Sequence, residues 1–308
     1  MFGRTRLVRS LKDKKYYALK IMKKVRIVNQ NQMTHVQNEI KILARLRCPF
    51  VVELHAVFQD ENSVYLLLQY VPGGELFSYL RRDKKFDTPL VQFYAVEVAC
   101  ALYQLHKMSI IYRDLKPENI LIDKIGHIRL TEFSLCKIIR DRTTTLCGTP
   151  EYISPEIING QGYGVSVDWW ALGVLVHEMA VGYPPFFGRN PFIVYRKILN
   201  GLVDIDESLP KPLKALLRGM LAPIRTQRIG SGGFDQLKTQ AFFKGVDWQS
   251  AFQKLIVPLL VPTVMAEGDT SNFDFYPEES IEQPANLTQD ERKMFQVLDE
   301  LLDRSPQS

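Results

Sequence analysis

The sequence predicts an α+β fold with a small β-rich lobe, a large helical lobe and an extended tail. Strand-forming residues dominate the first part of the 308-residue chain. A Pro72-Gly73-Gly74 break follows, and beyond it apolar residues recur at helical spacing. The end of the chain is richer in Pro, Asp and Glu. We therefore expect three regions, covering residues 1–70, 71–245 and 246–308.

Two strands and one helix are expected in the small lobe. The segments Tyr16–Met22 and Ser63–Tyr70 are rich in β-branched and aromatic residues. Between them, apolar residues at spacings of four and three predict an amphipathic helix. Its apolar stripe consists of Val36, Ile40 and Leu43. The same helix carries His35 and Glu39, so these two polar side chains are held beside the strands.

Helices are expected throughout the large lobe. Thr88 followed by Pro89 is a good helix start, with a hydroxyl cap and a proline in the first turn. The segment Val167–Met179 is apolar nearly all round, which predicts a buried helix. A short helix is expected at Arg292–Leu302. We find no terminal F-x-x-F pattern in the tail.

The composition is that of a globular protein of the cytoplasm, and of the nucleus as a second compartment. The formal charge is only +5, and the basic run from Lys12 to Lys15 reads as a solvated turn, so no nucleic-acid partner is expected. The four cysteines show no C-x-x-C pair and no metal-ligand spacing, which favours reduced thiols. No apolar run approaches the length of about 20 residues that spans a membrane.

The segment from Tyr112 to Asn119 carries the strongest chemical signal. Transfer of a phosphoryl group to a hydroxyl needs a carboxylate that orients the hydroxyl, a positive charge on the moving group and an oxygen ligand for a metal. Asp114, Lys116 and Asn119 supply these three functions within six residues. One loop can therefore direct all three at one point, and we expect Asp114 and Lys116 to be catalytic.

Further motifs follow in a consistent order. Ala18-Leu19-Lys20 is typical of a strand whose lysine holds nucleotide phosphates, and Glu39 is the natural ion-pair partner of Lys20. The segment Gly148–Glu156 ends in Ser-Pro-Glu. This segment resembles the end of the activation segment of protein kinases, and the resemblance implies a buried salt bridge between Glu156 and Arg228.

These motifs resemble those of eukaryotic protein kinases, and four segments narrow the resemblance to the AGC branch and its cAMP-dependent protein kinase family. The segments are Tyr70–Glu75, Thr145–Tyr152, Gly182–Phe187 and Gly268–Phe273. The resemblance extends over nearly the whole chain. It implies a bilobal kinase fold with an AGC-type tail and a Ser/Thr kinase activity that uses ATP with Mg²⁺ or Mn²⁺.

The resemblance also implies roles in nucleotide binding. Lys20 would hold the α and β phosphates, positioned by Glu39, and Asn119 with Glu132 would hold the metal. The remaining residues of this group would surround the nucleotide at the hinge and the tail: Leu68, Gln69, Val71, Glu75, Phe273 and Tyr276.

Protein substrates with basic residues before the phosphoacceptor are a further implication. Glu75, Glu118 and Glu178 match acidic positions that bind arginines two and three residues before the target Ser or Thr. Carboxylates that accept a guanidinium group bidentately suit that preference. The residue after the target would enter an apolar pocket formed by Leu146, Pro150 and Ile153.

Thr145 would be an activating phosphorylation site in this family. Its phosphate would be gathered by His35, Arg113 and Lys137, which would order the loop and set the helix that carries Glu39. A cAMP-binding regulatory subunit is a partner of the family. Thr144 argues against it here, because it replaces a Trp that belongs to the surface bound by that subunit.

Two departures from the family pattern leave a second function open. Glu132-Phe133-Ser134 stands where the family has D-F-G, and the longer Glu132 side chain moves the carboxylate that Mg²⁺ needs in near-ideal geometry. Phe2-Gly3-Arg4 matches only the end of the glycine-rich loop, so the first strand and two glycines are missing. The alternative to a kinase is therefore a pseudokinase that serves as a binding or scaffold module.

Overall fold

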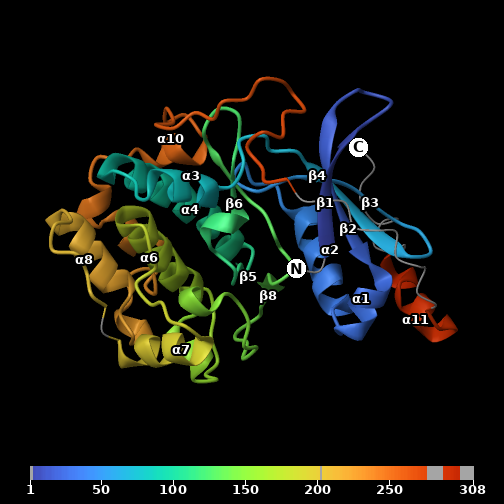
Figure 1. The fold of residues 1–308 in the computed structure, drawn as a ribbon. Helices are drawn as coiled ribbons and strands as arrows, with labels where there is room; N and C mark the ends of the chain where they lie inside the picture. The colour runs from blue at the N-terminus through green and yellow to red at the C-terminus, as the bar shows by residue number, and fades with distance from the viewer. Residues whose placement is uncertain (1–2, 202, 276–286, 299–308) are drawn as a thin grey trace.

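The computed structural model describes residues 3–201, 203–275 and 287–298, and it has the two lobes and the α+β architecture that the sequence predicts (Figure 1). The small lobe contains an antiparallel sheet with strand order β1-β2-β4-β3. Its strands are β1 (Gly3–Arg9), β2 (Tyr16–Lys23), β3 (Leu54–Gln59) and β4 (Ser63–Gln69). The two predicted strands are confirmed to within one residue at their ends.

Helices α1 (Lys24–Asn29) and α2 (Met33–Arg45) pack against this sheet. The predicted apolar stripe of α2 is confirmed, because Val36, Ile40 and Leu43 are buried in the core. On β2, side chains alternate between the two faces of the sheet, which places Lys20 on the buried face, paired with Leu66 of β4. The period of the strand thus turns Lys20 toward the helix that carries Glu39.

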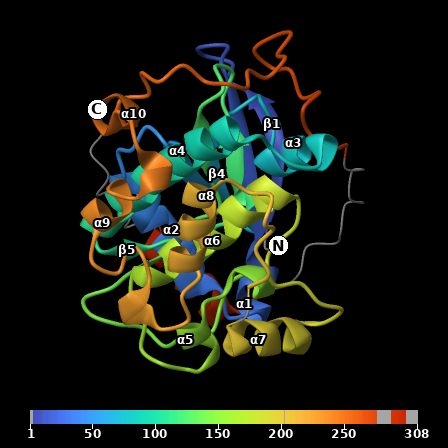
Figure 2. The ribbon, with the colours of Figure 1, turned by 90° about the vertical axis from the view of Figure 1, so that its left-hand side faces the viewer.

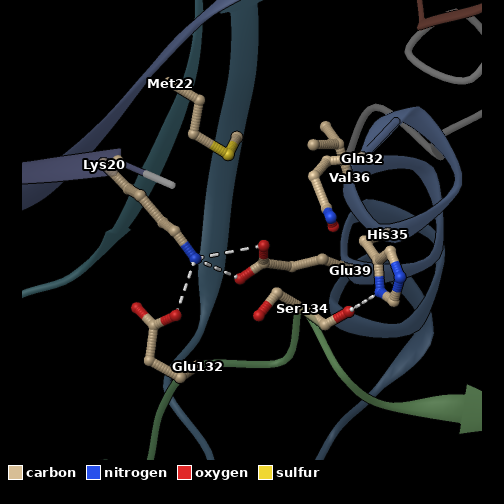
Figure 3. Close-up of a pocket in the computed structure, with 9 residues that line it drawn as sticks. Lys20, Met22, Gln32, His35, Val36, Glu39, Glu132 and Ser134 are labelled. Atoms are coloured by element: carbon tan, nitrogen blue, oxygen red, sulfur yellow. Dashed lines mark hydrogen bonds and ion pairs between the residues drawn. The ribbon is translucent and has the colours of Figure 1, made fainter. Parts of the chain in front are cut away.

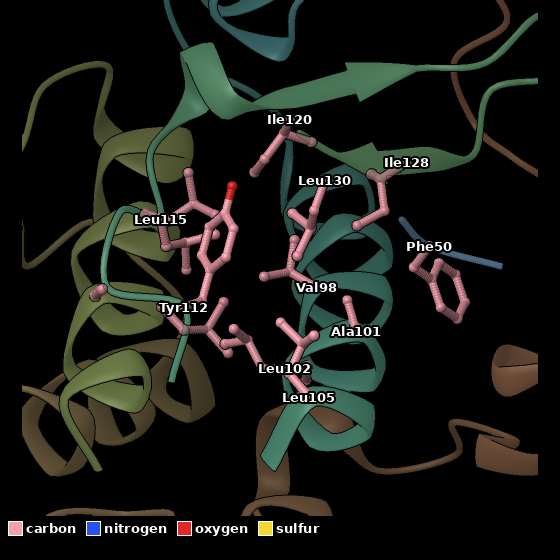
Figure 4. Packing of buried hydrophobic residues seen from close by; sticks show 14 of the residues in the cluster. Phe50, Val98, Ala101, Leu102, Leu105, Tyr112, Leu115, Ile120, Ile128 and Leu130 are labelled. Carbon is pink, nitrogen blue, oxygen red and sulfur yellow. The ribbon is translucent and has the colours of Figure 1, made fainter. Parts of the chain in front are cut away.

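The large lobe is built around two helices, α4 (Thr88–Lys107) and α6 (Ser166–Val181), which pack on each other. The expected buried helix is confirmed, because every residue of α6 except Val181 is buried. Figure 4 shows Val98, Leu102 and Leu105 of α4 facing Tyr112 and the strands that follow it. The remaining helices are α3 (Leu76–Asp83), α5 (Pro155–Ile158), α7 (Pro191–Asn200), α8 (Lys211–Met220), α9 (Phe234–Lys238) and α10 (Trp248–Phe252).

The cap of α4 differs from the prediction by one residue. Asp87, not Thr88, is the N-cap, and its carboxylate accepts a hydrogen bond from the amide of Leu90 (3.1 Å). Thr88 is the first helical residue and Pro89 lies in the first turn. Asp is at least as favourable as Thr at the N-cap position. Because Asp87 stands three residues before Leu90, its carboxylate can accept the Leu90 amide, which has no partner within the helix.

Four short strands carry the loops that hold the site. They are β5 (Ile110–Ile111), β6 (Ile120–Ile122), β7 (Ile128–Leu130) and β8 (Lys137–Ile138). β6 pairs with β7 and β5 with β8, both antiparallel. The two hairpin-like pairs bring the loop after β5 next to the loop after β7.

Residues 253–275 run along the side of the molecule away from α7, as both ribbon views show (Figures 1 and 2). Asn272 fixes this segment to the hinge by donating to the carbonyl oxygen of Pro72 (3.1 Å). Among the described residues, no helix is long and apolar enough to cross a membrane.

The last described part of the tail is a helix followed by residues that contact the small lobe. α11 (Gln289–Met294) begins three residues before the predicted start, because Thr288 and Glu291 form a capping box that the prediction overlooked. Phe295 and Leu298 are 1% exposed. The Lys24 ammonium lies 4.9 Å from the Phe295 ring centroid, and Gln59 donates to the Phe295 carbonyl (3.2 Å). Phe295 therefore anchors this part of the tail to the small lobe, which the lack of a terminal F-x-x-F pattern did not predict.

Candidate active site

Lys20 and Glu39 meet beneath the sheet of the small lobe. The Lys20 ammonium lies 2.8 Å and 3.1 Å from the two carboxylate oxygens of Glu39, and both side chains are buried (Figure 3). Burial alone would lower the pKa of Lys20, but the charges of Glu39 and Glu132 outweigh it and raise that pKa above its ordinary value. Lys20 is therefore a fixed positive charge at this point.

Glu132 approaches the same lysine from the other lobe. Its Oε2 lies 3.2 Å from Lys20 Nζ. The backbone of Glu132 is left-handed (φ 56°), a region that Asp and Asn tolerate better than Glu. Ser134 avoids that region, so the replacement of the family's glycine causes no left-handed strain here. Phe133 is buried edge-on against Tyr112, with centroids 5.4 Å apart, which fixes the loop that presents Glu132.

The loop after β5 places Asp114 and Asn119 side by side. Asn119 Nδ2 donates to the carbonyl of Asp114 (2.7 Å) and to its carboxylate (2.8 Å). The loop is held from below by Asp168, whose carboxylate accepts the amides of Tyr112 and Arg113 (2.9 Å each). Arg113 is left-handed (φ 70°), which turns the chain sharply before Asp114.

Thr149 is a residue of the site to which sequence reasoning gave no role. Its hydroxyl donates to Asp114 Oδ1 (3.0 Å) and accepts from Lys116 Nζ (3.1 Å). It therefore ties the carboxylate to the ammonium group, which lie 3.7 Å apart. The only signal in the sequence was the presence of a hydroxyl residue in the Gly148–Glu156 segment. The direction of its side chain could not be predicted from the sequence.

The two halves of the site are joined by the backbone. The amide of Thr131 donates to the carbonyl of Asn119 (3.0 Å), and the Tyr112 hydroxyl donates to the carbonyl of Thr131. Glu132 follows Thr131 directly, so it lies beside Asn119. Lys20, Asp114, Asn119 and Glu132, which are distant in sequence, thus belong to one continuous set of contacts, as the sequence analysis requires.

Asn119 and Glu132 fit a hard divalent cation. The amide nitrogen of Asn119 is engaged by Asp114, which leaves the carbonyl oxygen as the available ligand atom. Oxygen donors from one or two side chains, completed by water and phosphate oxygens, are the usual set for Mg²⁺. Within the described ranges, no group of three or more His, Cys, Asp or Glu side chains forms an all-protein metal cage. The donor set therefore suits a metal bound together with phosphates.

A narrow pocket adjoins Lys20 and Glu132 on the side of α2 (Figure 3). His35 closes one wall by donating from Nδ1 to the carbonyl of Ser134 (2.8 Å). The pocket is lined by Gly3, Lys20, Met22, Gln32, His35, Val36, Glu39, Glu132 and Ser134.

Three carboxylates gather beyond the catalytic loop. Burial and the charge of Glu118 raise the pKa of Glu75, and burial raises the pKa of Glu178 as well, with Glu118 adding to it. The Tyr152 hydroxyl donates to Glu178. The structure thus places Glu118 close enough to Glu75 and to Glu178 to repel each of them, and cations would relieve this repulsion.

The hinge residues lie beside the tail. Leu68 and Val71 are buried, and Gln69 is half-buried. The backbone amide of Gln69 donates a hydrogen bond to the backbone carbonyl of Glu53 (2.8 Å). The Phe273 ring lies 6.2 Å from that of Tyr70 in the hinge. Tyr276, the other expected cap of the adenosine pocket, lies outside the described residues.

Thr145 is exposed and surrounded by hydroxyl groups and cations. Its carbonyl accepts from Tyr163 (2.6 Å), and Arg113 donates to the same tyrosine hydroxyl (3.2 Å). Lys137 donates to Thr143 (2.8 Å), whose hydroxyl lies 3.4 Å from that of Thr145. Two of the three expected phosphate ligands therefore lie one hydroxyl away from this threonine. His35, the third, is bonded to Ser134 instead.

The three apolar residues expected to form one pocket are in different surroundings. Ile153 is 4% exposed and packs in a second core cluster with Ile111 and Tyr163. Leu146 is 59% exposed, and Pro150 is half-buried at the start of a 3-10 turn.

The expected salt bridge between Glu156 and Arg228 is confirmed. Arg228 donates twice to the carboxylate, with distances of 2.7 Å and 2.8 Å, and neither residue is more than 5% exposed. Burial disfavours the carboxylate, but the bonds from Arg228 outweigh it and hold the pKa of Glu156 below its ordinary value. This pair fixes the end of the activation segment to the large lobe.

Comparisons with known proteins agree with this geometry. The family model described as the protein kinase domain matches residues 1–243. The cAMP-dependent protein kinase catalytic subunit PRKX of Homo sapiens is 45% identical over 296 residues, which is 96% of this chain and 83% of the human protein. Catalytic subunit 3 of the cAMP-dependent kinase of Drosophila melanogaster is 46% identical, covering 90% of this chain and 48% of that protein. The catalytic subunit of Dictyostelium discoideum is 44% identical, over 92% and 44% respectively.

Proposed function

This chain belongs to the protein kinase family as an AGC-type Ser/Thr kinase similar to cAMP-dependent catalytic subunits, and from that premise we propose that it transfers the γ-phosphate of ATP to Ser or Thr in basic protein sequences. The observation that supports the proposal is the continuous set of contacts that links Lys20, Glu132, Asn119 and Asp114 between the lobes. A divalent metal is part of the proposal, with Mg²⁺ before Mn²⁺.

The roles follow from the contacts. Lys20, held by Glu39, binds the α and β phosphates as a fixed cation. Asp114 orients the substrate hydroxyl and receives its proton, while Lys116 neutralises charge on the phosphoryl group in transit. Thr149 keeps these two side chains aligned. Asn119 and Glu132 would hold the metal, which would offset the negative charge of the phosphate groups.

The preference for basic substrates is supported by the three carboxylates near the cleft. Burial partly desolvates the Glu75 and Glu178 carboxylates, and the charge of Glu118 lies near both. Their ionised forms are therefore destabilised in the free protein. An arginine guanidinium that donates to both oxygens of a carboxylate would restore that stabilisation. We propose that these residues read arginines two and three positions before the phosphoacceptor.

A pseudokinase remains a second candidate because of one observation. Glu132 uses one of its oxygens on Lys20, at 3.2 Å, the same ammonium that the nucleotide phosphates need. In that alternative the fold binds nucleotide or partners without useful turnover.

A phosphate-transfer assay separates the two candidates. The substrates are an Arg-Arg-Ala-Ser peptide and its matched Ala-Ala-Ala-Ser control, each with ATP and either Mg²⁺ or Mn²⁺. Selective phosphorylation of the arginine peptide supports the kinase with its proposed specificity. Equal phosphorylation of both peptides removes the specificity and keeps the kinase. No transfer by the folded chain or by its Glu132→Asp variant supports the pseudokinase.

A further inference from the structure

One side of the molecule exposes large apolar side chains that the proposed reaction does not use. Six of them are at least 58% exposed: Leu11, Leu255, Val257, Leu259, Val261 and Met265. Single exposed apolar residues are common on soluble proteins, but contiguous groups mark interaction sites. We call this group the tail-side face.

The segment from Leu255 to Pro262 explains the regular exposure. From Leu255 to Val261 its side chains alternate between exposed and half-buried positions. Ile256 and Leu260 pack against the core, whereas Leu255, Val257, Leu259 and Val261 are exposed. A segment with one solvated side would ordinarily carry polar residues on that side. Here both sides of the segment are apolar, so packing against the large lobe explains only the half-buried apolar side chains and not the exposed ones.

Two close contacts join other turns to this segment. Gly126, in the β6–β7 turn, has no room for a side chain, because an added Cβ would clash with the carbonyl oxygen of Leu260. The β6–β7 turn therefore lies directly against the tail. That turn presents Ile125, which is 55% exposed, beside the exposed Lys124. A Cβ added at Gly268 would lie 2.5 Å from the Tyr16 ring, so the turn after Met265 lies against the base of the β1–β2 hairpin. Both ribbon views place the hairpin tip, this turn and the tail on the same side (Figures 1 and 2).

The hairpin tip adds positive charge to the tail-side face. Leu11 is 88% exposed and is followed by the exposed Lys12, Lys14 and Lys15. The turn is ordered by hydrogen bonds between Ser10 and Lys15 (2.9 Å) and between Lys14 and Ser10 (3.1 Å). It therefore presents an exposed apolar side chain next to three exposed lysines.

The acidic groups of the face are Asp13 in the hairpin and Glu267, Asp269 and Asp274 in the tail. Asp13 accepts from the Tyr17 hydroxyl (2.8 Å), and Asp269 accepts from the amide of Met265 (2.7 Å). Glu267 is exposed. A hollow beside Leu259 contains Lys85 together with Asp83 and Asp87. The net charge is thus most positive at the hairpin tip.

We propose that the tail-side face docks on the surface of an anionic lipid bilayer. The lysines of the hairpin contact the lipid headgroups, and Leu11 enters the interface together with the exposed side chains of the tail. Apolar residues mixed with lysine are the composition that such surfaces bind. Nucleic acid would use the lysines but would gain little from aliphatic residues, and the cores of protein interfaces are depleted in lysine. The proposal is independent of the kinase reaction.

The orientation is compatible with catalysis at the membrane. The helices α5 and α7, which flank the activation segment, lie on the opposite side of the molecule (Figures 1 and 2). A chain docked by the tail-side face therefore keeps its activation segment toward solvent, where protein substrates and activating enzymes reach it.

Co-sedimentation with vesicles tests the proposal. The full chain is mixed with vesicles of phosphatidylcholine alone and with vesicles that also contain phosphatidylserine. We expect binding to the anionic vesicles only. The triple variant Lys12→Gln/Lys14→Gln/Lys15→Gln should reduce that binding about 100-fold, since each basic residue near an anionic surface adds about fivefold. The variant Leu11→Ser/Val257→Ser should reduce it by tenfold or more.

Matched controls lie on the other side of the chain. Phe192 is 82% exposed on α7, and Arg189, Arg196 and Lys211 are exposed cations away from the hairpin. Phe192→Ser and Arg189→Gln/Arg196→Gln/Lys211→Gln should bind vesicles as the parent chain does. All altered positions are exposed, and thermal melting verifies that each variant is folded.

Three results would overturn the proposal. The first is no binding of the folded parent chain to anionic vesicles. The second is equal loss in the control variants. The third is binding to a DNA duplex, measured by fluorescence anisotropy, that needs the hairpin lysines, is unaffected by Leu11→Ser/Val257→Ser and occurs without vesicle binding; that outcome makes the face a nucleic-acid surface.

Discussion

Lys20 and Glu132 form an ion pair between the two lobes, with Nζ and Oε2 3.2 Å apart. The pair joins the strand that carries the proposed phosphate-binding amine to the loop that carries the proposed metal ligand. Lys20 is buried, whereas the Glu132 side chain is 34% exposed. The Glu132 carboxylate therefore has an ammonium partner and can also reach a metal. The length of the Glu132 side chain determines whether the carboxylate binds the ammonium group or the metal.

Shortening that side chain should favour the metal. Glu132→Asp removes one methylene and places a residue that tolerates the left-handed backbone at φ 56°. We expect kcat with Mg²⁺ to rise by roughly tenfold or more, because Mg²⁺ demands near-ideal ligand geometry. The measurement is the Mg²⁺ dependence of peptide phosphorylation. Glu132→Gln is the control, and a rise in this amide variant equal to that in the aspartate would contradict the explanation.

Thr149 should matter for turnover and little for folding. Thr149→Val removes the hydroxyl that links Asp114 to Lys116 at 3.0 Å and 3.1 Å. Hydrogen bonds to charged groups contribute about 1.5–3 kcal/mol, so kcat should fall by roughly 10- to 100-fold. Thr149→Ser should retain most of the activity. An unchanged kcat in the valine variant would show that the hydroxyl has no part in alignment.

Recognition of arginine should weaken on acidification. Burial raises the pKa of Glu178 and of Glu75, with Glu118 adding to both, so each carboxylate takes up a proton at a higher pH than an ordinary Glu. As the pH falls from about 8 to about 5, KM for the arginine peptide should rise before KM for the alanine control does. Tyr152→Phe removes a hydrogen bond that lowers the pKa of Glu178, and should move this loss to higher pH. Parallel KM curves for the two peptides would argue against the carboxylates.

The buried pair of Glu156 and Arg228 should dominate the stability of the large lobe. Glu156→Gln leaves an uncompensated buried guanidinium and should cost about 3–5 kcal/mol in the free energy of unfolding. The folded-state pKa of Glu156 lies below its unfolded value, so this stabilisation is complete above about pH 4.5 and is lost as the pH falls through the folded pKa. Urea unfolding at several pH values measures it. Glu207→Gln, which breaks an exposed pair with Lys214, should have little effect at any pH.

Elements with strong local signals could be predicted from the sequence. Strands Tyr16–Lys23 and Ser63–Gln69 and helix α6 follow period and composition, and the pairing of Glu156 with Arg228 follows the family motifs. The predicted start of α11 was wrong because the capping box of Thr288 and Glu291 determines where the helix begins. Phe295 could not be predicted as an anchor because it belongs to no F-x-x-F pattern, and its burial depends on where the tail returns to the small lobe.

The candidate site was predictable in its members but not in its contacts. Lys20, Glu39, Asp114 and Asn119 follow from residue type and order, and the structure brings them together. The link from Thr149 to Asp114 spans 35 residues and depends on how the activation segment folds back. The same holds for Ile153, which turns into a core cluster away from the exposed Leu146. Side-chain direction in irregular loops is set by tertiary packing, which no local pattern encodes.

The measurement that tests the central claim most directly is phosphoryl transfer by Asp114→Asn. The claim is that Asp114 acts on the substrate hydroxyl beside the phosphates bound by Lys20 and the metal held by Asn119 and Glu132. We predict that the variant binds ATP with the affinity of the parent chain and transfers phosphate to the arginine peptide roughly 100- to 10,000-fold more slowly. Transfer at the parental rate by a folded Asp114→Asn variant would contradict the account.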